Sequence, residues 1–299
     1  MRNRIVRGIM IALVAVVLLA GCAVTGGVRK DMGVVVDTVK TDSFTMDYCM
    51  FGCGKRTLVI VPGLSVQSVM PSAQAIADSY NAFADDFTVY VFDRRKDQPK
   101  TYSIDDMARD TAAAMEQLGI GNADIFGASQ GGMIAMVIAI TRPELVHSLI
   151  LGSTSSRIGD EQYGLIESWV RLAQAGKRED LYLAFVEALY PEAVFESSRE
   201  LLIQAAATVT DDDLARFVVM ATALKGFDMT SCLPDITCPV LVLGSEDDKV
   251  VGSEASRVIK EGLTSSPCSR IYMYDGYGHA VYDLAPDYHE RMLEFLESN

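Results

Sequence analysis

The sequence is poor in histidine and in positive charge. Its 299 residues include 3 histidines, and 26 lysines and arginines stand against 40 aspartates and glutamates, which gives a formal net charge of −14 at pH 7. Binding to nucleic acid or to anionic lipid needs clustered cations. The charge balance therefore argues against both kinds of partner. No histidine keeps a zinc-ligand spacing to the 6 cysteines, so we expect no metal site.

The N-terminus resembles a targeting segment. Arg2, Arg4 and Arg7 precede an apolar run over residues 9–20, and the run ends in Leu-Ala-Gly-Cys at Cys22. This ending is similar to a bacterial lipobox, in which the cysteine is lipidated after cleavage. We therefore expect a signal peptide over residues 1–21 and a lipidated tether over residues 22–33. The protein would then be lipid-anchored outside the cytoplasm, in the cell membrane or outer membrane, unless the segment is an ordinary signal peptide or an uncleaved anchor.

Five cysteines remain after Cys22. An extracytoplasmic location permits disulfides, and two pairs are close in sequence, but spacing does not fix connectivity. Free thiols are the alternative, and none of these cysteines lies in a turn typical of a nucleophile. The five are Cys49, Cys53, Cys232, Cys238 and Cys268.

The remaining sequence is typical of one sizeable α/β domain. Hydrophobic residues make up 49% of the chain, which argues against disorder. Residues 34–50 predict two alternating strands in a hairpin, and residues 72–84 and 103–118 predict helices, the second with a Ser103–Asp106 capping box. Helices that alternate with strands predict a mainly parallel central sheet flanked by helices.

The motif Gly127-Ala128-Ser129-Gln130-Gly131 predicts a nucleophile. A strand-like run over residues 123–126 precedes it, and an apolar helix-like run over residues 133–139 follows it. In this strand–turn–helix context, G-x-S-x-G forms a sharp turn that exposes the serine hydroxyl. The two glycines permit the crowding of the turn because they lack a Cβ. The alternative is a glycine-rich turn before a core helix.

Candidate partners for the serine follow later in the chain. His279 stands in a glycine-bearing loop after a strand-like run over residues 270–274, and we expect it to be the base. His147, between a helix end and a strand start, is expected at the surface or in packing, and His289 on a solvated helix. The acid is one of three adjacent carboxylates that follow the strand-like run over residues 239–244. They are Glu246, Asp247 and Asp248.

From about residue 34 to its end, the chain resembles an α/β-hydrolase. The resemblance rests on the nucleophile motif, the strand and loop over residues 57–65, the Asp-x-Arg turn that begins at Asp93, the G-x-x-D turn that ends at Asp247, and Gly278-His279. It implies that Ser129 attacks, that His279 acts first as base and then as acid, and that Asp247 orients His279, with Asp248 as the other candidate.

The same resemblance implies an oxyanion hole made by the backbone N–H groups of Leu64 and Gln130. Two segments depart from the family pattern. Pro62-Gly63 stands where the family usually has His-Gly, and residues 96–100 replace the usual Gly-x-Gly-x-Ser. A backbone donor does not need the histidine side chain, so we retain Leu64.

The regular alternation stops over residues 155–231, where the sequence predicts only helices. This is the usual place for a helical cap in the family, inserted after the sixth core strand, between core segments 34–154 and 232–299. Its large apolar residues would line a substrate pocket or form the core of the cap. They are Trp169, Tyr182, Phe185, Phe217 and Met220.

The predicted function is that of a membrane-tethered serine hydrolase that cleaves an ester-type bond of a small molecule without a cofactor. Thioesters, amides and C–C bonds remain open, as does acyl transfer, because one fold supports many reactions. A peptidase that holds a substrate amine would need acids in the cap. A ligand-binding lipoprotein without catalysis is the alternative from another class. The available cap acids are Glu161, Glu167, Glu179 and Glu187.

Overall fold

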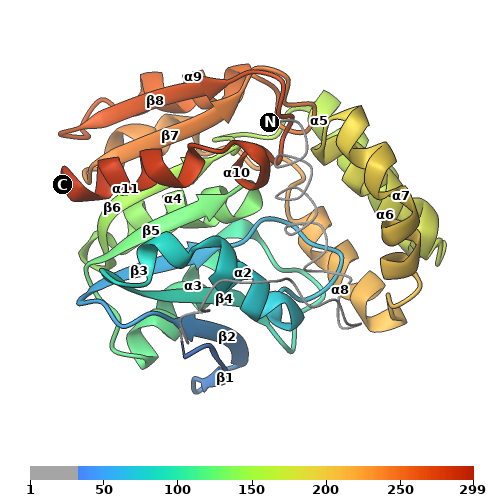
Figure 1. Cartoon of the computed structure of the whole chain (residues 1–299), viewed down its shortest axis with the longest axis horizontal. Coiled ribbons are helices and arrows are strands. Elements are labelled where there is room, and N and C mark those ends of the chain that lie inside the picture. The colour runs from blue at the N-terminus through green and yellow to red at the C-terminus, as the bar shows by residue number, and fades with distance from the viewer. Residues whose placement is uncertain (1–32) are drawn as a thin grey trace, which may run out of the picture.

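A computed structural model describes residues 33–299, so the predicted signal peptide and the lipobox cysteine Cys22 lie outside the described residues. An eight-stranded sheet forms the centre, in the order β1-β2-β4-β3-β5-β6-β7-β8 (Figure 1). The pairs β1–β2 and β2–β4 are antiparallel, and all other pairs are parallel. This confirms the predicted fold class. The strands are β1 (Val35–Lys40), β2 (Thr45–Phe51), β3 (Arg56–Val61), β4 (Phe87–Arg95), β5 (Ala123–Ala128), β6 (Val146–Gly152), β7 (Val240–Ser245) and β8 (Ser269–Tyr274).

Burial along the strands follows their position in the sheet. Every residue of β5 and β7 is buried, as expected for parallel strands that are covered on both faces. The edge strand β1 buries only Val39. It forms the predicted hairpin with β2, in a register that pairs Val35 with Met50 and Lys40 with Thr45.

Helices cover both faces of the sheet (Figure 1). Buried side chains of α3, α4 and α9 belong to one apolar cluster, and those of α2, α10 and α11 belong to the other. Within residues 33–299, no helix combines the length and the apolar character needed to cross a membrane. These helices are α2 (Ala73–Ser79), α3 (Ile104–Gln117), α4 (Gln130–Thr141), α9 (Glu254–Gly262), α10 (Val281–Leu284) and α11 (Tyr288–Glu297), with short 3-10 turns at η1 (Met70–Ser72), η2 (Asn81–Phe83), η3 (Pro143–Leu145) and η4 (Thr230–Asp235).

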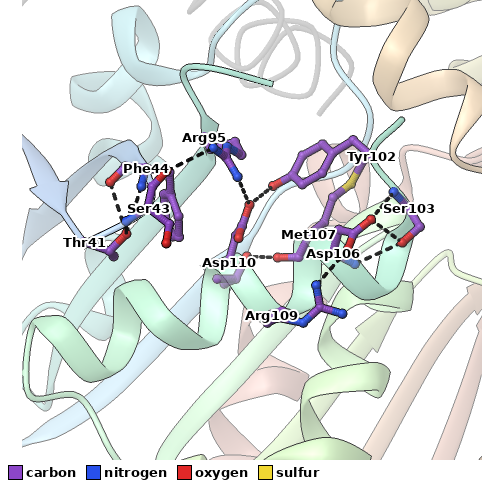
Figure 2. A network of polar contacts seen from close by, with 11 residues as sticks. Thr41, Ser43, Phe44, Arg95, Tyr102, Ser103, Asp106, Met107, Arg109 and Asp110 are labelled. Atoms are coloured by element: carbon purple, nitrogen blue, oxygen red, sulfur yellow. Dashed lines mark hydrogen bonds and ion pairs between the residues drawn. The ribbon is translucent and has the colours of Figure 1, made fainter. Parts of the chain in front are cut away.

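Polar contacts fasten α3 to the end of β4 (Figure 2). The predicted capping box is present: the Asp106 amide donates to Ser103 Oγ at 3.1 Å, and the Ser103 amide donates to Asp106 Oδ2 at 3.0 Å. One turn further, Asp110 Oδ2 accepts from the Tyr102 hydroxyl at 2.9 Å and lies 3.5 Å from Arg95 Nη1. These contacts therefore hold the end of β4 against α3.

A helical insertion separates β6 from β7 and lies at one end of the sheet (Figure 1). The chain enters and leaves it through a short antiparallel neck. There the Ile158 amide donates to the Phe227 carbonyl at 2.8 Å, and the Met229 amide donates to the Ser156 carbonyl at 2.9 Å. We call the segment between Ile158 and Phe227 the helical insertion. Its helices are α5 (Asp160–Gln174), α6 (Arg178–Leu189), α7 (Glu192–Ala206) and α8 (Asp211–Thr222).

His289 does not lie where the sequence analysis expected it. His289 packs its ring against Tyr80 and Phe83 instead of being solvated. Burial lowers its pKa to about 4, although a hydrogen bond with the Ser79 backbone acts in the opposite direction.

The five cysteines of the described residues form no disulfide with one another. Burial raises the pKa of the Cys49 thiol to about 11, so Cys49 is a packing residue of β2.

Candidate active site

Ser129 lies in a sharp turn between β5 and α4, as the motif predicts. Its backbone has φ +52° and ψ −123°, a conformation that non-glycine residues seldom adopt. The Ser129 amide donates to the Gly152 carbonyl at 2.8 Å, and the Thr154 hydroxyl donates to the Ser129 carbonyl at 2.6 Å. The end of β6 and the residues just after it therefore hold both the amide and the carbonyl of Ser129.

The flanking glycines are required by close backbone approaches. A Cβ on Gly131 would lie 1.9 Å from the Val61 carbonyl oxygen, and a Cβ on Gly127 would lie 2.5 Å from the Gly131 oxygen. Real Cβ atoms do not come this close, so no other residue fits without moving β3 or α4. The glycines of the motif thus allow the turn to pack directly against the end of β3.

His279 lies in the loop after β8 and is fully buried, with 1% of its surface exposed. Its Nδ1 lies 2.8 Å from Asp248 Oδ2. Asp248 Oδ1 accepts from the Val250 and Val251 amides at 2.8 and 3.0 Å. Burial raises the pKa of Asp248, but the His279 charge and these hydrogen bonds outweigh burial and leave the pKa below its usual value. Asp248 is therefore an anion, which only accepts, so when the His279 ring is neutral its proton lies on Nδ1 and Nε2 can accept a proton.

Asp247, the predicted partner of His279, makes different contacts, so this prediction was wrong in its geometry. Its Oδ1 accepts from Ser245 Oγ at 2.7 Å and from the Gly276 amide at 3.2 Å, and its Oδ2 accepts from the Gly278 amide at 3.0 Å. The turn after β7 runs one residue longer than the family spacing implied. Asp247 consequently braces the loop that carries His279, and Asp248 reaches the ring.

Ser129 and His279 line the same pocket, together with Leu64 and Gln130, the two predicted oxyanion residues. The cavity that water-sized molecules can occupy in this pocket is small, about 30 Å³. A Cβ on Gly63 would lie 3.1 Å from Ser129 Cβ, so the backbone just before Leu64 passes directly beside the serine. The structure therefore brings these four predicted residues together at one pocket.

The helical insertion supplies one wall of the pocket. Trp169 and Phe185 line it with their rings 5.0 Å apart, whereas Tyr182, Phe217 and Met220 are buried but do not line it. None of the described residues that line the pocket is Asp, Glu, Lys or Arg. The four insertion acids considered for amine binding are therefore not at this site.

Sequence reasoning missed Tyr282, Val250 and Val251, which also line the pocket. Tyr282 follows His279 by three residues on α10, and the two valines follow Asp248. Their only signal was their position directly after the two predicted site loops. Short-range neighbours of site residues are natural lining residues, because the loops that carry them end at the same edge of the sheet.

The sequence pattern of the alpha/beta hydrolase fold matches residues 56–286. The chain therefore belongs to the α/β-hydrolase fold family, and it is a hydrolase. This agrees with the order of Ser129, Asp248 and His279 along the chain, which is the order of the family's triad.

Relatives with assigned names support a hydrolase. The chain is 27% identical over 256 residues to a protein of Rhizobium rhizogenes named "Putative carbamate hydrolase RutD", over 81% of this chain and 93% of that protein. It is 24% identical to 3-oxoadipate enol-lactonase 2 of Acinetobacter baylyi, over 82% and 94%. The crystal structure of MGS-M2, an alpha/beta hydrolase from a deep-sea metagenome library, matches with a TM-score of 0.77 at 19% identity, over 87% and 97% of the two chains. The last likeness is one of fold.

Proposed function

We propose that the chain is a membrane-tethered serine hydrolase that cleaves an ester-type bond in a small neutral molecule. One observation carries the proposal: Ser129, in its strained turn, shares a pocket with His279, whose Nδ1 is held by Asp248. A nucleophile beside a base that is itself oriented by a third group is the arrangement needed to activate a hydroxyl. The roles of the three residues follow from this arrangement.

In the first half-reaction, Ser129 Oγ attacks the carbonyl carbon and its proton passes to His279 Nε2. Asp248 stabilises the resulting imidazolium, and the Leu64 and Gln130 backbone N–H groups donate to the oxyanion. His279 then gives the proton to the leaving oxygen as the C–O bond breaks. The products are a free alcohol and an acyl group on Ser129.

In the second half-reaction, His279 takes a proton from water and the hydroxide oxygen attacks the acyl carbon. The tetrahedral intermediate collapses, the bond to Ser129 Oγ breaks, and His279 returns the proton to Oγ. A carboxylic acid leaves and the enzyme is restored. Every proton is carried by His279, so the cycle needs no group beyond this chain and water.

The lining of the pocket favours neutral substrates. Apolar side chains such as Ile166, Leu189 and Leu224 surround Ser129, without a charged partner from Lys or Arg among the described lining residues. A substrate carboxylate or amine would lose its hydration there without compensation. The activities that the relatives' names state, carbamate hydrolysis and enol-lactone hydrolysis, both cleave a bond between a carbonyl carbon and a heteroatom, and this supports the proposed bond type.

The test uses the full chain in detergent. A fluorophosphonate should add once, with the adduct on the peptide that contains Ser129. The protein should hydrolyse 4-nitrophenyl pentanoate with a kcat/KM at least about 100-fold above that for 4-nitrophenyl hydrogen succinate, because burying an unpaired carboxylate costs several kcal/mol. Well-folded protein without an adduct or turnover would favour the ligand-binding alternative. Faster acyl transfer to an added alcohol than to water would favour an acyltransferase.

Membrane attachment is the second part of the proposal. It is supported by the basic, apolar and Leu-Ala-Gly-Cys pattern that ends at Cys22. Twelve residues separate Cys22 from β1, which begins at Val35, so an extended tether would reach about 40 Å from the bilayer. In a bacterial host, we expect wild type in the membrane fraction with incorporated labelled palmitate. Cys22→Ser should lose the label, and equal label in both proteins would refute lipidation at this residue.

A further inference from the structure

Among the described residues, helix α8 of the helical insertion makes two polar contacts with the core. Arg216 Nη2 forms an ion pair with Asp93 Oδ1 at the end of β4. One turn later, the Met220 carbonyl accepts from Gln130 Nε2 at 2.8 Å. Arg216 and Met220 lie on the same side of α8, because residues four apart are neighbours on a helix. A single helix therefore contacts both Asp93 and the side chain of Gln130.

Asp93 connects Arg216 to the loop that contains Leu64. Its Oδ2 accepts from Ser68 Oγ at 2.5 Å, and its Oδ1 accepts from the Arg94 amide at 2.7 Å. The Arg94 guanidinium in turn donates to the Pro62 carbonyl at 2.7 Å. The loop over residues 62–68 is thus held at its Ser68 end by the Asp93 carboxylate and at its Pro62 end by the guanidinium of the next residue, Arg94.

The ion pair lies in a poorly solvated place. The Asp93 and Arg216 side chains expose 10% and 17% of their surface, so solvent screens their attraction little. Arg94 is also buried, and burial, with a contribution from the Arg216 charge, lowers its pKa to about 10 although Asp93 opposes the shift. Loss of Arg216 would leave the Asp93 carboxylate with fewer partners, and we expect the Asp93–Arg94 turn to shift.

Gln130 provides the other connection. Its side chain is buried. The Met220 carbonyl can only accept a hydrogen bond, so the amide nitrogen of Gln130, Nε2, must be the atom that faces α8. Its Oε1 has no hydrogen-bond partner among the described residues. The contact with α8 therefore holds the side chain of the residue whose backbone N–H is the second proposed donor.

We propose that α8 positions the oxyanion hole: Arg216 acts through Asp93 on the Leu64 loop, and the Met220 carbonyl acts through the side chain of Gln130. Arg216 is a positioning residue that does not touch substrate. The inference rests on the proposed function, and it predicts that the two donors reach their productive places only when α8 is docked. Oxyanion donors act on the transition state more than on the bound substrate, so their misplacement lowers kcat more than it raises KM.

The test compares Arg216→Met with Arg216→Lys in the full chain, using 4-nitrophenyl pentanoate. Arg216→Met should lower kcat roughly 10- to 100-fold with KM changed by less than about 3-fold, because one oxyanion donor contributes about 100- to 1000-fold and is here displaced but not removed. Arg216→Lys should recover most of kcat. Arg171→Met is the matched control. It removes an exposed arginine whose ion-pair partner within residues 33–299 is Glu167 on its own helix α5, and kcat should not change.

A second readout separates positioning from simple support of the fold. A trifluoromethyl ketone adds to the serine and places an oxyanion in the hole, so its Ki should rise by the same factor as kcat/KM falls. A raised KM with unchanged kcat would overturn the inference. So would an unchanged Ki. If Arg216→Met lowers Tm strongly, Gln130→Met provides the test, because it keeps the backbone donor and removes the contact with α8; a kcat equal to that of wild type would then overturn the inference. Wild type without turnover would refute the proposed function itself.

Discussion

Replacing Ser129 with glycine should abolish hydrolysis and stabilise the fold at the same time. The loss in kcat should be at least about 10⁴-fold, because a triad acts as a unit and only oxyanion binding remains without its nucleophile. The gain in stability should be about 1 kcal/mol, which raises Tm by roughly 2–4 °C in a domain of this size.

The stability gain has a specific origin. At φ +52° and ψ −123°, a residue with a Cβ is strained by about 1–3 kcal/mol, whereas glycine adopts this conformation freely. Glycine gives back up to about 1 kcal/mol because its unfolded chain is more flexible. The contacts that hold the turn involve the Ser129 amide and carbonyl, which the substitution leaves in place.

Ser129→Ala is the control for this prediction. It removes the same hydroxyl but keeps the Cβ and therefore the strain. Both variants should be inactive and fail to react with the fluorophosphonate, while chemical denaturation should show a higher free energy of unfolding for glycine alone. Equal stability of the two variants would show that the strain in the turn is no larger than the stability that glycine loses through its more flexible unfolded chain.

The fold was predictable because its information is local. β5 and β7 are continuous apolar runs between turn residues, and the alternation of such runs with helical segments defines a parallel sheet. Ser129 was identifiable because its motif requires glycines at backbone approaches as short as 1.9 Å. His279 was identifiable because the chain has only two other histidines, neither in a loop after a strand.

What the sequence could not show depends on geometry or on distant residues. The choice between Asp247 and Asp248 is made by the path of one turn, in which the Val250 and Val251 amides fix the Asp248 carboxylate. The Arg216–Asp93 ion pair joins residues 123 positions apart, and no pattern along the chain links them. The sequence also left open which face of the helical insertion meets the pocket. In the structure Trp169 lines the pocket, whereas Phe217 is buried and does not line it.

The two neighbouring aspartates allow a matched pair of isosteric substitutions with very different expected results. Asp248→Asn should lower kcat about 10⁴-fold, as expected when the base is held in its wrong tautomer. The amide oxygen of the asparagine must face the Val250 and Val251 amides, which can only donate, so its NH₂ faces His279 Nδ1. His279 then accepts at Nδ1 and carries its proton on Nε2, where it cannot take one from Ser129.

Asp247→Asn should lower kcat by no more than about 10-fold. It removes one of the two hydrogen bonds by which Asp247 holds the His279 loop, from the Gly276 and Gly278 amides. Such a bond contributes about 1 kcal/mol to stability, and the Asp248–His279 contact is left intact. Steady-state kinetics with 4-nitrophenyl pentanoate and a melting curve for each variant make the comparison. A larger loss in Asp247→Asn than in Asp248→Asn, at equal Tm, would assign the orienting role to Asp247. The predicted order instead follows from where each carboxylate points: Asp248 toward the imidazole, and Asp247 toward the backbone of the loop that carries it.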